Sequence, residues 1–412
     1  LSDASAASFA LGNHVLAMLF LLFRVVGAGI SVVVSQCLGG GRRQAADEVA
    51  RATLGAATWL GGVTSLAALL GAVPMLRLLN APDDLMRLAV PYLQALAPGL
   101  LLDAWNATMA SVMRAHLRVR DTLAVILTMH ATHLALALLL MPRLGLLGFA
   151  LALAASRVLG ITLHLLLWRW RLGLVPRWPD WWSLPREALG AVVRIGLPGA
   201  GENIAWRLSF MVSVAVAGQF GAKALATQAY ALQITHIALL TAMAIGLSVE
   251  IVVGHLIGAG DLHGANRLVR NAMRWGLALA VTVSSTAALF GPWLIGQFTH
   301  DREIIATGTV LLWWMVALEP GRTFNLVLVN ALRATGDARF PLYAGVASMV
   351  GVLAGGSWFL GQYLGLGLAG IWIAYAADEW LRGLIMWTRW KRLGWVPHAR
   401  AAHRRLRRHE VG

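Results

Sequence analysis

The stretch Val34-Ser-Gln-Cys-Leu-Gly-Gly-Gly-Arg-Arg-Gln-Ala-Ala-Asp-Glu48 decides the fold, because it recurs in altered form as Val253-Gly-His-Leu-Ile-Gly-Ala-Gly-Asp-Leu-His-Gly-Ala-Asn-Arg267. The same offset of 219 positions relates other pairs along the chain. These are Gly27 and Gly246, Arg51 and Arg270, Asn106 and Asn325, Arg114-Ala115 and Arg333-Ala334, and Arg120 and Arg339. A second offset, of 222, relates Arg157 to Glu379. The pattern indicates two halves of common origin.

Composition indicates a polytopic membrane protein. Of the 412 residues, 58% are hydrophobic and 13% are charged, and that charged share is about half of what a soluble domain carries. A helix needs about 20 apolar residues to cross a bilayer. Such spans are predicted at 10–38, 47–77, 84–114, 121–141, 146–171, 190–220, 223–258, 265–296, 302–333, 339–361 and 368–391. A duplicated bundle of membrane helices is the usual build of a secondary transporter, with the substrate site between the halves.

The predicted domains follow from the repeat. The first lobe is 1–172, a cytoplasmic interfacial linker rich in tryptophan and arginine is 173–186, the second lobe is 187–395 and a basic tail is 396–412. In the second half a helix at 189–220 precedes the repeated region, and its counterpart would lie before Leu1. We therefore expect five helices plus six here, and six plus six in the intact protein.

The net charge of +15, from 34 basic and 19 acidic residues, is sorted by loop. Alternate connections are rich in arginine, whereas the intervening loops hold few basic residues. The rich set is Arg42, Arg43, Arg114, Arg118, Arg120, Arg169, Arg171, Arg177, Arg186, Arg333, Arg339, Arg404, Arg405, Arg407 and Arg408. By the positive-inside rule this set is cytoplasmic, which predicts a cytoplasmic C-terminus. We expect a multi-pass protein of a bacterial inner (cell) membrane. The tail is expected to meet lipid headgroups rather than nucleic acid.

Several classes of chemistry have no sequence support. The lone Cys37 offers neither a disulfide nor a CxxC metal site. Gly365-Leu-Gly-Leu-Ala-Gly370 matches the dinucleotide-binding pattern but opens a membrane helix with no preceding strand. The sequence contains no Walker A motif, metal-ligand cluster or nucleophile elbow. We expect no enzyme activity, cofactor or resident metal.

Several motifs together resemble the multidrug and toxic compound extrusion (MATE) transporters over nearly the whole chain. They are the paired loops Gly39–Arg51 and Gly258–Arg270, Gly196-Leu-Pro198, Leu332-Arg-Ala-Thr-Gly-Asp337, and Gly367-Leu-Ala-Gly-Ile-Trp-Ile-Ala374 with its echo Gly145-Leu-Leu-Gly-Phe-Ala-Leu-Ala152. The resemblance implies two pseudo-symmetric all-α bundles around a central cleft. It also implies a monomer that exports small organic, often cationic, compounds in exchange for H⁺ or Na⁺.

The chain departs from the family pattern at the coupling positions. One branch relies on an acidic residue in its first helix and on Asn and Asp in the fifth, where this chain offers His130 and His133. Another branch has an acidic residue in helix ten, about three turns before the Leu-Arg motif. Here Arg322 lies near that place, with Glu319 one turn earlier.

Polar groups within the predicted spans are the candidate site residues, because a charged side chain at the bilayer centre costs at least about 2.5–3.5 kcal/mol unless it is paired or hydrated. The candidates for substrate binding or ion coupling are Asp103, Asn106, Glu202, Arg207, Glu250, Glu319, Arg322, Asn325, Asp378 and Glu379. Arg24, Arg157 and Arg382 are further mid-helix charges, and His130, His133, His164 and His236 form either a proton relay or hydrogen-bonded packing.

Two candidates stand beside helix-weakening residues. Glu319 and Arg322 share a helix face next to Pro320-Gly321, so they either line a cavity or form a static ion pair that holds a bend. Glu202 follows Pro198-Gly-Ala-Gly201 and is the first choice for coupling, since a proton and a cationic substrate could compete for its charge. The alternative for Glu202 is a structural acid that is capped or paired with Arg207.

These observations favour a cation-coupled exporter that works by alternating access. A flippase for lipid-linked saccharides is the alternative, and it requires a cleft with more arginine than carboxylate, for which Arg24, Arg157, Arg207 and Arg322 are available. A non-transporting membrane protein is the third hypothesis.

Overall fold

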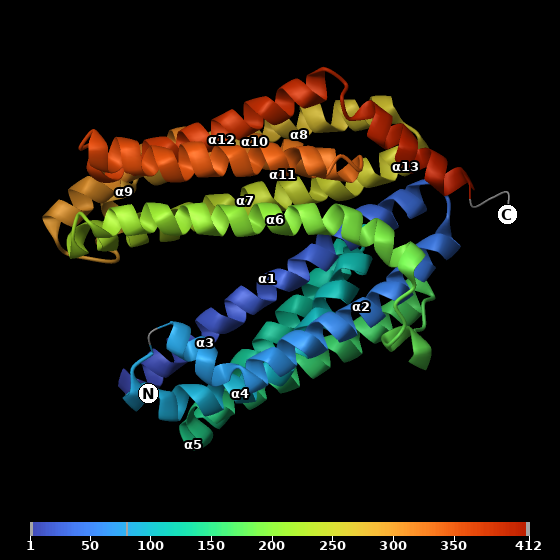
Figure 1. Ribbon diagram of the computed structural model, residues 1–412, viewed down its shortest axis with the longest axis horizontal. Helices are drawn as coiled ribbons and strands as arrows, with labels where there is room; N and C mark the ends of the chain where they lie inside the picture. The colour runs from blue at the N-terminus through green and yellow to red at the C-terminus, as the bar shows by residue number, and fades with distance from the viewer. Residues whose placement is uncertain (1–2, 80, 409–412) are drawn as a thin grey trace. The chain divides into compact units, whose positions relative to one another are not determined.

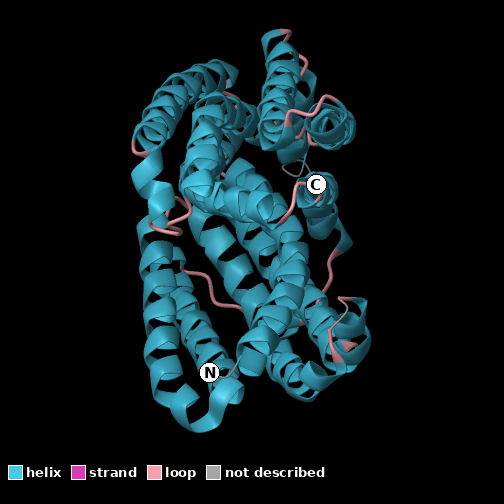
Figure 2. Cartoon of the chain, turned by 90° about the vertical axis from the view of Figure 1, so that its left-hand side faces the viewer, coloured by secondary structure: helices cyan, strands magenta, loops and turns pink. Residues whose placement is uncertain are grey.

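The all-helical prediction is confirmed by a computed structural model, which describes residues 3–79 and 81–408 (Figure 2). No strand occurs in that part of the chain. The first half contains α1 (Asp3–Gly39), α2 (Arg43–Leu70), α3 (Ala72–Leu78), α4 (Asp83–Ala115), α5 (Val119–Leu167), η1 (Trp168–Leu172) and η2 (Trp178–Trp181). The second half contains α6 (Arg186–Gly218), α7 (Ala222–Ala259), α8 (Leu262–Leu289), α9 (Gly291–Gly296), α10 (Arg302–Ala334), α11 (Arg339–Ser348), η3 (Met349–Ala354), η4 (Ser357–Tyr363), α12 (Gly367–Lys391) and α13 (Val396–Arg408).

Seven helical segments of the described residues are long and apolar enough to cross a membrane. They are Arg43–Leu70, Asp83–Ala115, Val119–Leu172, Ala222–Ala259, Leu262–Leu289, Arg302–Ala334 and Arg339–Tyr363. Val119–Leu172 holds the two spans predicted at 121–141 and 146–171, so these segments cover eight of the eleven predicted spans. Helices α1, α6 and α12 cover the other three but are not among the seven, and α1 contains two shorter apolar stretches.

By contacts between residues the chain divides into two compact units, Leu1–Leu38 with Arg42–Ala200 and Gly39–Gly41 with Gly201–Gly412. In the first unit α4 packs against both α2 and α5 (Figure 1). In the second unit α10 packs against α7, α8 and α12. The central helices α4 and α10 correspond under the repeat. The division between units falls within α6, whereas the sequence places the linker at 173–186; that linker remains a prediction.

The two units share their backbone landmarks, which supports the repeat independently of side chains. Glycines at the ends of α1 and α7 take positive φ, +74° at Gly41 and +82° at Gly260, and they are 219 positions apart. At the same offset Leu117 (φ 61°) corresponds to Gly336 (φ 90°). Positive φ is costly for residues with a Cβ, so these positions are conformationally demanding. Their pairing shows that both halves turn at corresponding points.

A second pair of glycines marks the next helix boundary in each unit. Gly145, with φ 57° and ψ −135°, breaks α5 into two helices between the two spans predicted there. Gly367, 222 positions later, has φ 59° and opens α12. Three residues on, Gly148 and Gly370 each press against the preceding helix, where a Cβ would come within 2.6 Å of the carbonyls of Leu140 and Leu360 respectively. The halves therefore repeat a close helix crossing as well as a turn.

Helices α4, α6 and α10 run through their internal prolines without ending. In α10 the turn before Pro320 is supported from outside, because the indole nitrogen of Trp380 donates a hydrogen bond to the Ala317 carbonyl at 2.8 Å. A Cβ on Gly321 would meet the same indole ring. The weak point predicted at Pro320-Gly321 is therefore a docking point for a tryptophan of α12.

The predicted linker contains one short 3-10 turn, η2, which contacts α2. Trp181 packs edge-on against Trp105 of α4, with ring centroids 5.0 Å apart. The indole of Trp59 donates to the Trp182 carbonyl at 3.0 Å. The side chains of Trp178 and Trp182 are exposed. The segment is thus attached to the first unit through the ring of Trp181 and the carbonyl of Trp182, while two of its tryptophan side chains remain exposed.

Candidate functional site

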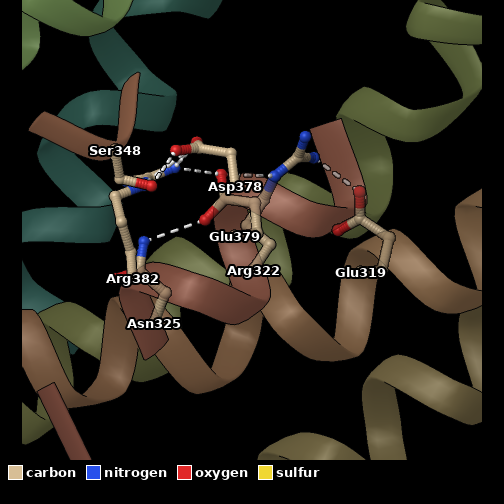
Figure 3. A network of polar contacts seen from close by, with 7 residues as sticks. All are labelled: Glu319, Arg322, Asn325, Ser348, Asp378, Glu379 and Arg382. Carbon is tan, nitrogen blue, oxygen red and sulfur yellow. Dashed lines mark hydrogen bonds and ion pairs between the residues drawn. The ribbon is translucent and has the colours of Figure 1, made fainter. Parts of the chain in front are cut away.

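Buried charges gather in the second unit between α10 and α12 (Figure 3). We call Glu319, Arg322, Asp378, Glu379 and Arg382 the charge cluster. Glu319 and Arg322 come from α10, and the other three lie on one face of α12, three and four positions apart. All three carboxylates and Arg382 are buried, and the Arg322 side chain is 11% exposed.

Ion pairs run through the cluster in a chain. Glu319 accepts from Arg322 at 2.5 Å, and Arg322 lies 3.6 Å from Glu379. Arg382 lies 2.8 Å from Glu379 and 2.7 Å from Asp378. These contacts bring together four of the predicted candidates, with Arg382 at the centre of the α12 portion. Buried charges without such pairing would be prohibitively costly.

Two neutral side chains also hydrogen-bond to the carboxylates of the cluster, one to Glu379 in the middle of the chain and one to Asp378 at its end. The Asn325 amide donates to Glu379 at 2.8 Å, and the Ser348 hydroxyl donates to Asp378 at 2.7 Å. One carboxylate oxygen of Glu319 and the amide oxygen of Asn325 are buried without a hydrogen-bond partner among the described residues. Both atoms are hydrogen-bond acceptors, so the group that would satisfy them is a hydrogen-bond donor or a cation.

Glu202 forms a separate ion pair in the same unit. Its carboxylate lies 2.6 Å from Arg333 at the end of α10, and both side chains are about nine-tenths buried, with 10% and 12% exposed. The partner is therefore Arg333 rather than the predicted Arg207, which is exposed on α6. Glu202 also packs beside Gly345 of α11, where a Cβ would lie 3.4 Å from its side chain.

The first unit contains a smaller polar group at the corresponding place. Arg157 of α5 donates to Asp103 of α4 at 2.5 Å, with side-chain exposures of 12% and 19%. Asn106 donates to the Arg157 carbonyl at 2.9 Å and to the Leu102 carbonyl at 3.0 Å. The Nδ1 atom of His164 lies 3.0 Å from the Gly160 carbonyl. Asp103 and Asn106 thus belong to one polar group through their shared contacts with Arg157.

The two groups are related by the repeat, with their charges exchanged. Asp103 corresponds to Arg322 at offset 219, and Arg157 corresponds to Glu379 at offset 222. Each unit therefore pairs its central helix with the last helix of its repeat through one carboxylate and one guanidinium group. The direction of the pair is reversed: the acid lies on α4 in the first unit and on α12 in the second.

Other predicted candidates have different surroundings. Glu250 is buried in α7, two turns before the loop at Gly258. His133 packs edge-on against Phe149 at 4.7 Å between centroids, which fits a packing histidine. The side chain of Arg24 lies outside the described residues.

Sequence reasoning missed some partners within these networks. Ser348 carries no sequence signal, because a serine in an apolar helix is common and its contact with Asp378 spans 30 positions. Arg333 was noted as a repeat marker, a loop arginine and part of the Leu332–Asp337 motif, but not as a partner of Glu202, and that pairing spans 131 positions. Arg382 was recognisable as a mid-helix charge, and its spacing of three and four from the two acids was the usable signal.

Comparison with known proteins identifies the family. The MatE family model matches residues 1–139 and 198–358, which is more than half of the chain. The chain belongs to the MatE family. An uncharacterized transporter of Bacillus subtilis, YisQ, is 33% identical over 96% of this chain and 88% of its own length. A probable multidrug resistance protein NorM of Thermotoga maritima is 23% identical over 89% of this chain and 80% of its own length.

Solved structures show the same fold. A MATE protein in a bent conformation superposes with a TM-score of 0.88 at 19% identity, covering 98% of this chain and 90% of that one. An outward-facing multidrug resistance MATE family transporter of the MOP superfamily gives 0.88 at 19% identity, over 97% and 89%. Membership in the MatE family supports a role as a membrane transporter.

Proposed function

We propose that this MatE-family chain is a secondary antiporter that exports organic, cationic or amphipathic compounds in exchange for H⁺ or Na⁺. The internal repeat supports alternating access, since inverted or duplicated helical modules are the usual basis of that mechanism. The chain's relatives include proteins described as probable multidrug resistance proteins. The bilayer and a small organic substrate are the partners that this proposal requires.

The observation that carries the proposal is the charge balance of the charge cluster. The charge cluster holds three carboxylates and two guanidinium groups, and the Glu202–Arg333 pair is neutral. One buried carboxylate charge is therefore in excess. A single uncompensated charge in this environment is strongly unfavourable, so the cluster is suited to take up a proton or one monovalent cation.

Glu319 is the group we propose for coupling. Its second carboxylate oxygen is buried without a hydrogen-bond partner in the described structure, whereas both oxygens of Asp378 have partners, Ser348 and Arg382. A proton on Glu319, or a cation beside it, would neutralise the excess charge. Release of that ion restores the charge, and a cationic substrate can then compete for it. That competition is the minimum chemistry of antiport.

The test is transport by the full-length protein in proteoliposomes, with ethidium as the probe and an imposed H⁺ or Na⁺ gradient. Glu319→Gln should abolish gradient-driven ethidium movement, by at least about tenfold, because the amide cannot exchange a proton. Glu303→Gln is the matched control, since Glu303 is exposed and pairs with Lys223 outside the cluster. Equal gradient-driven transport by Glu319→Gln and the parent would reject Glu319. Parent transport that ignores both gradients would reject antiport.

The flippase alternative is less well supported by these contacts. Two of the arginines that it requires, Arg157 and Arg322, are already paired with carboxylates. The two buried atoms without a hydrogen-bond partner here, on Glu319 and on the neighbouring Asn325, are acceptors, which suits a cation rather than an anionic lipid-linked sugar. A cell-free assay that follows a fluorescent lipid-linked oligosaccharide across proteoliposomes would favour the flippase if translocation occurred without an ion gradient.

A further inference from the structure

The C-terminal helix α13 is docked onto the end of the second unit by its apolar face. Trp395, the residue before α13, and Ala399 within it are buried there, and Trp395 stacks on Trp390 of α12 with centroids 4.4 Å apart. Trp390 is fixed in turn by donating its indole hydrogen to Asn266 at 3.0 Å. Helix α13 is therefore an integral part of the unit rather than a free tail.

The same helix contacts the turn between α7 and α8. The Nδ1 atom of His403 lies 2.9 Å from the Gly258 carbonyl. A Cβ on Gly260 would lie 3.2 Å from the His403 ring, so the histidine closes over this glycine. Gly41, the counterpart of Gly260 in the first repeat, has open space at that position. Helix α13 thus covers Gly260 through His403, whereas its counterpart Gly41 is left uncovered.

The flank of α13 and the turn before it are strongly basic. Arg400 and Arg404, four positions apart, are exposed on one face of α13, and Lys391 and Arg392 are exposed where α12 ends. We call these four residues the tail surface. The sequence holds no Asp or Glu between Glu379 and Glu410. The nearby Asp337 is occupied by Arg389 at 3.0 Å and by His398 at 3.8 Å.

The geometry points to an anionic phospholipid as the ligand of the tail surface. None of these four exposed cations has a carboxylate partner in the described structure. Lys391 and Arg392 lie where α12, a predicted membrane span, ends, and Arg400 and Arg404 lie on α13, which follows. Leu393, between them in the sequence, is 55% exposed. Basic side chains with an exposed apolar side chain at a helix end match the boundary between headgroups and acyl chains. The lipid headgroup would hold α13 in place, and α13 would hold the α7–α8 turn through His403.

The experiment uses the full-length protein in neutral detergent, titrated with phosphatidylglycerol and observed by native mass spectrometry. The double variant Arg400→Gln/Arg404→Gln should bind the first phosphatidylglycerol more weakly by about 25-fold, since each basic residue near an anionic surface contributes about 1 kcal/mol, or about fivefold. The control Arg87→Gln/Arg302→Gln removes two exposed arginines elsewhere and should leave that affinity unchanged. Equal affinity of the tail-surface variant and the parent would overturn the proposal.

Two further measurements test, first, whether the ligand is a membrane lipid or a soluble phosphate and, second, whether α13 stabilises the α7–α8 turn. Displacement of the lipid by millimolar glycerol phosphate would show a soluble phosphate site and overturn the membrane assignment. Hydrogen exchange in nanodiscs follows the turn directly: residues 258–262 should exchange more slowly with phosphatidylglycerol than with phosphatidylcholine, in the parent but not in the double variant. Unchanged exchange in the parent would overturn the stabilising role of α13. None of these measurements depends on transport, so they test the lipid site independently of the coupling proposed for Glu319.

Discussion

The two repeats differ in their charges far more than in their backbones. Both turn at positive φ at corresponding sites, and both press a glycine against the preceding helix. Yet the pair Asp103–Arg157 becomes Arg322–Glu379, with acid and base exchanged. A buried ion pair requires opposite charges but not a particular direction. The crossing of α4 with α5, and of α10 with α12, therefore requires two opposite charges but does not fix which helix carries the acid.

The second repeat also holds charges that the first cannot accommodate. Arg382 corresponds to Gly160 at offset 222, and a Cβ on Gly160 would lie 2.7 Å from the Asn106 side chain and 2.8 Å from Met129. The first repeat therefore fills this space with an asparagine and a methionine. The second leaves room for a guanidinium group that contacts both Asp378 and Glu379. The excess carboxylate also belongs to the second repeat alone, since the first repeat pairs one acid, Asp103, with one base, Arg157.

Removal of this extra arginine should give the largest effect on stability. In Arg382→Met the side-chain volume is approximately kept, but Asp378 and Glu379 lose their shared cation. We expect the free energy of unfolding to fall by about 3–5 kcal/mol, the usual cost of breaking a buried pair. Thermal unfolding in detergent would measure it, with the exposed Arg302→Met as control. A variant as stable as that control would show that the charge cluster does not depend on Arg382.

Reversal of the first repeat's ion pair tests the comparison directly. Asp103→Arg and Arg157→Glu should each cost about 2–4 kcal/mol, somewhat less than a fully buried pair because these side chains are partly exposed. The double variant reproduces the polarity of Arg322–Glu379 and should recover at least half of the summed loss. A double-mutant cycle on thermal unfolding measures the coupling. Strictly additive losses would mean that the crossing accepts one direction only.

The fold is predictable from sequence because its determinants are periodic or repeated. Apolar spans of about 20 residues define membrane helices, and the offset of 219 relates Gly41 to Gly260 from the residues alone. The division of α5 at Gly145 also matches the gap between two predicted spans. In contrast, the helical order of α13 and its docking through Trp395 depend on tertiary contacts with α7 and α12 that the sequence does not display.

The candidate site is predictable in its members but not in its pairings. Mid-helix charges are identifiable because lipid makes them costly, which singles out Glu319, Arg322, Asp378 and Glu379. Pairs within one helix, such as Glu319 and Arg322, follow from spacing. Contacts between helices, such as Glu202 with Arg333, depend on helix rotation and depth, which no local pattern sets. That limit explains why the sequence favours Glu202 for coupling, whereas the contacts favour Glu319.

The smallest expected effect concerns the turn at Leu117 and Gly336, where the two repeats use different residues for one left-handed conformation. Gly336→Ala should lower the free energy of unfolding by about 1–2 kcal/mol, because a Cβ is unfavourable at positive φ even where it has open space. Leu117→Gly relieves the same strain and loses little packing, since Leu117 is exposed. The greater entropy of glycine in the unfolded chain offsets part of that gain, so the change should stay below about 1 kcal/mol. Thermal unfolding of both variants decides whether the turns are equivalent. A larger loss for Leu117→Gly than for Gly336→Ala would show that Leu117 is held by contacts that its repeat partner lacks.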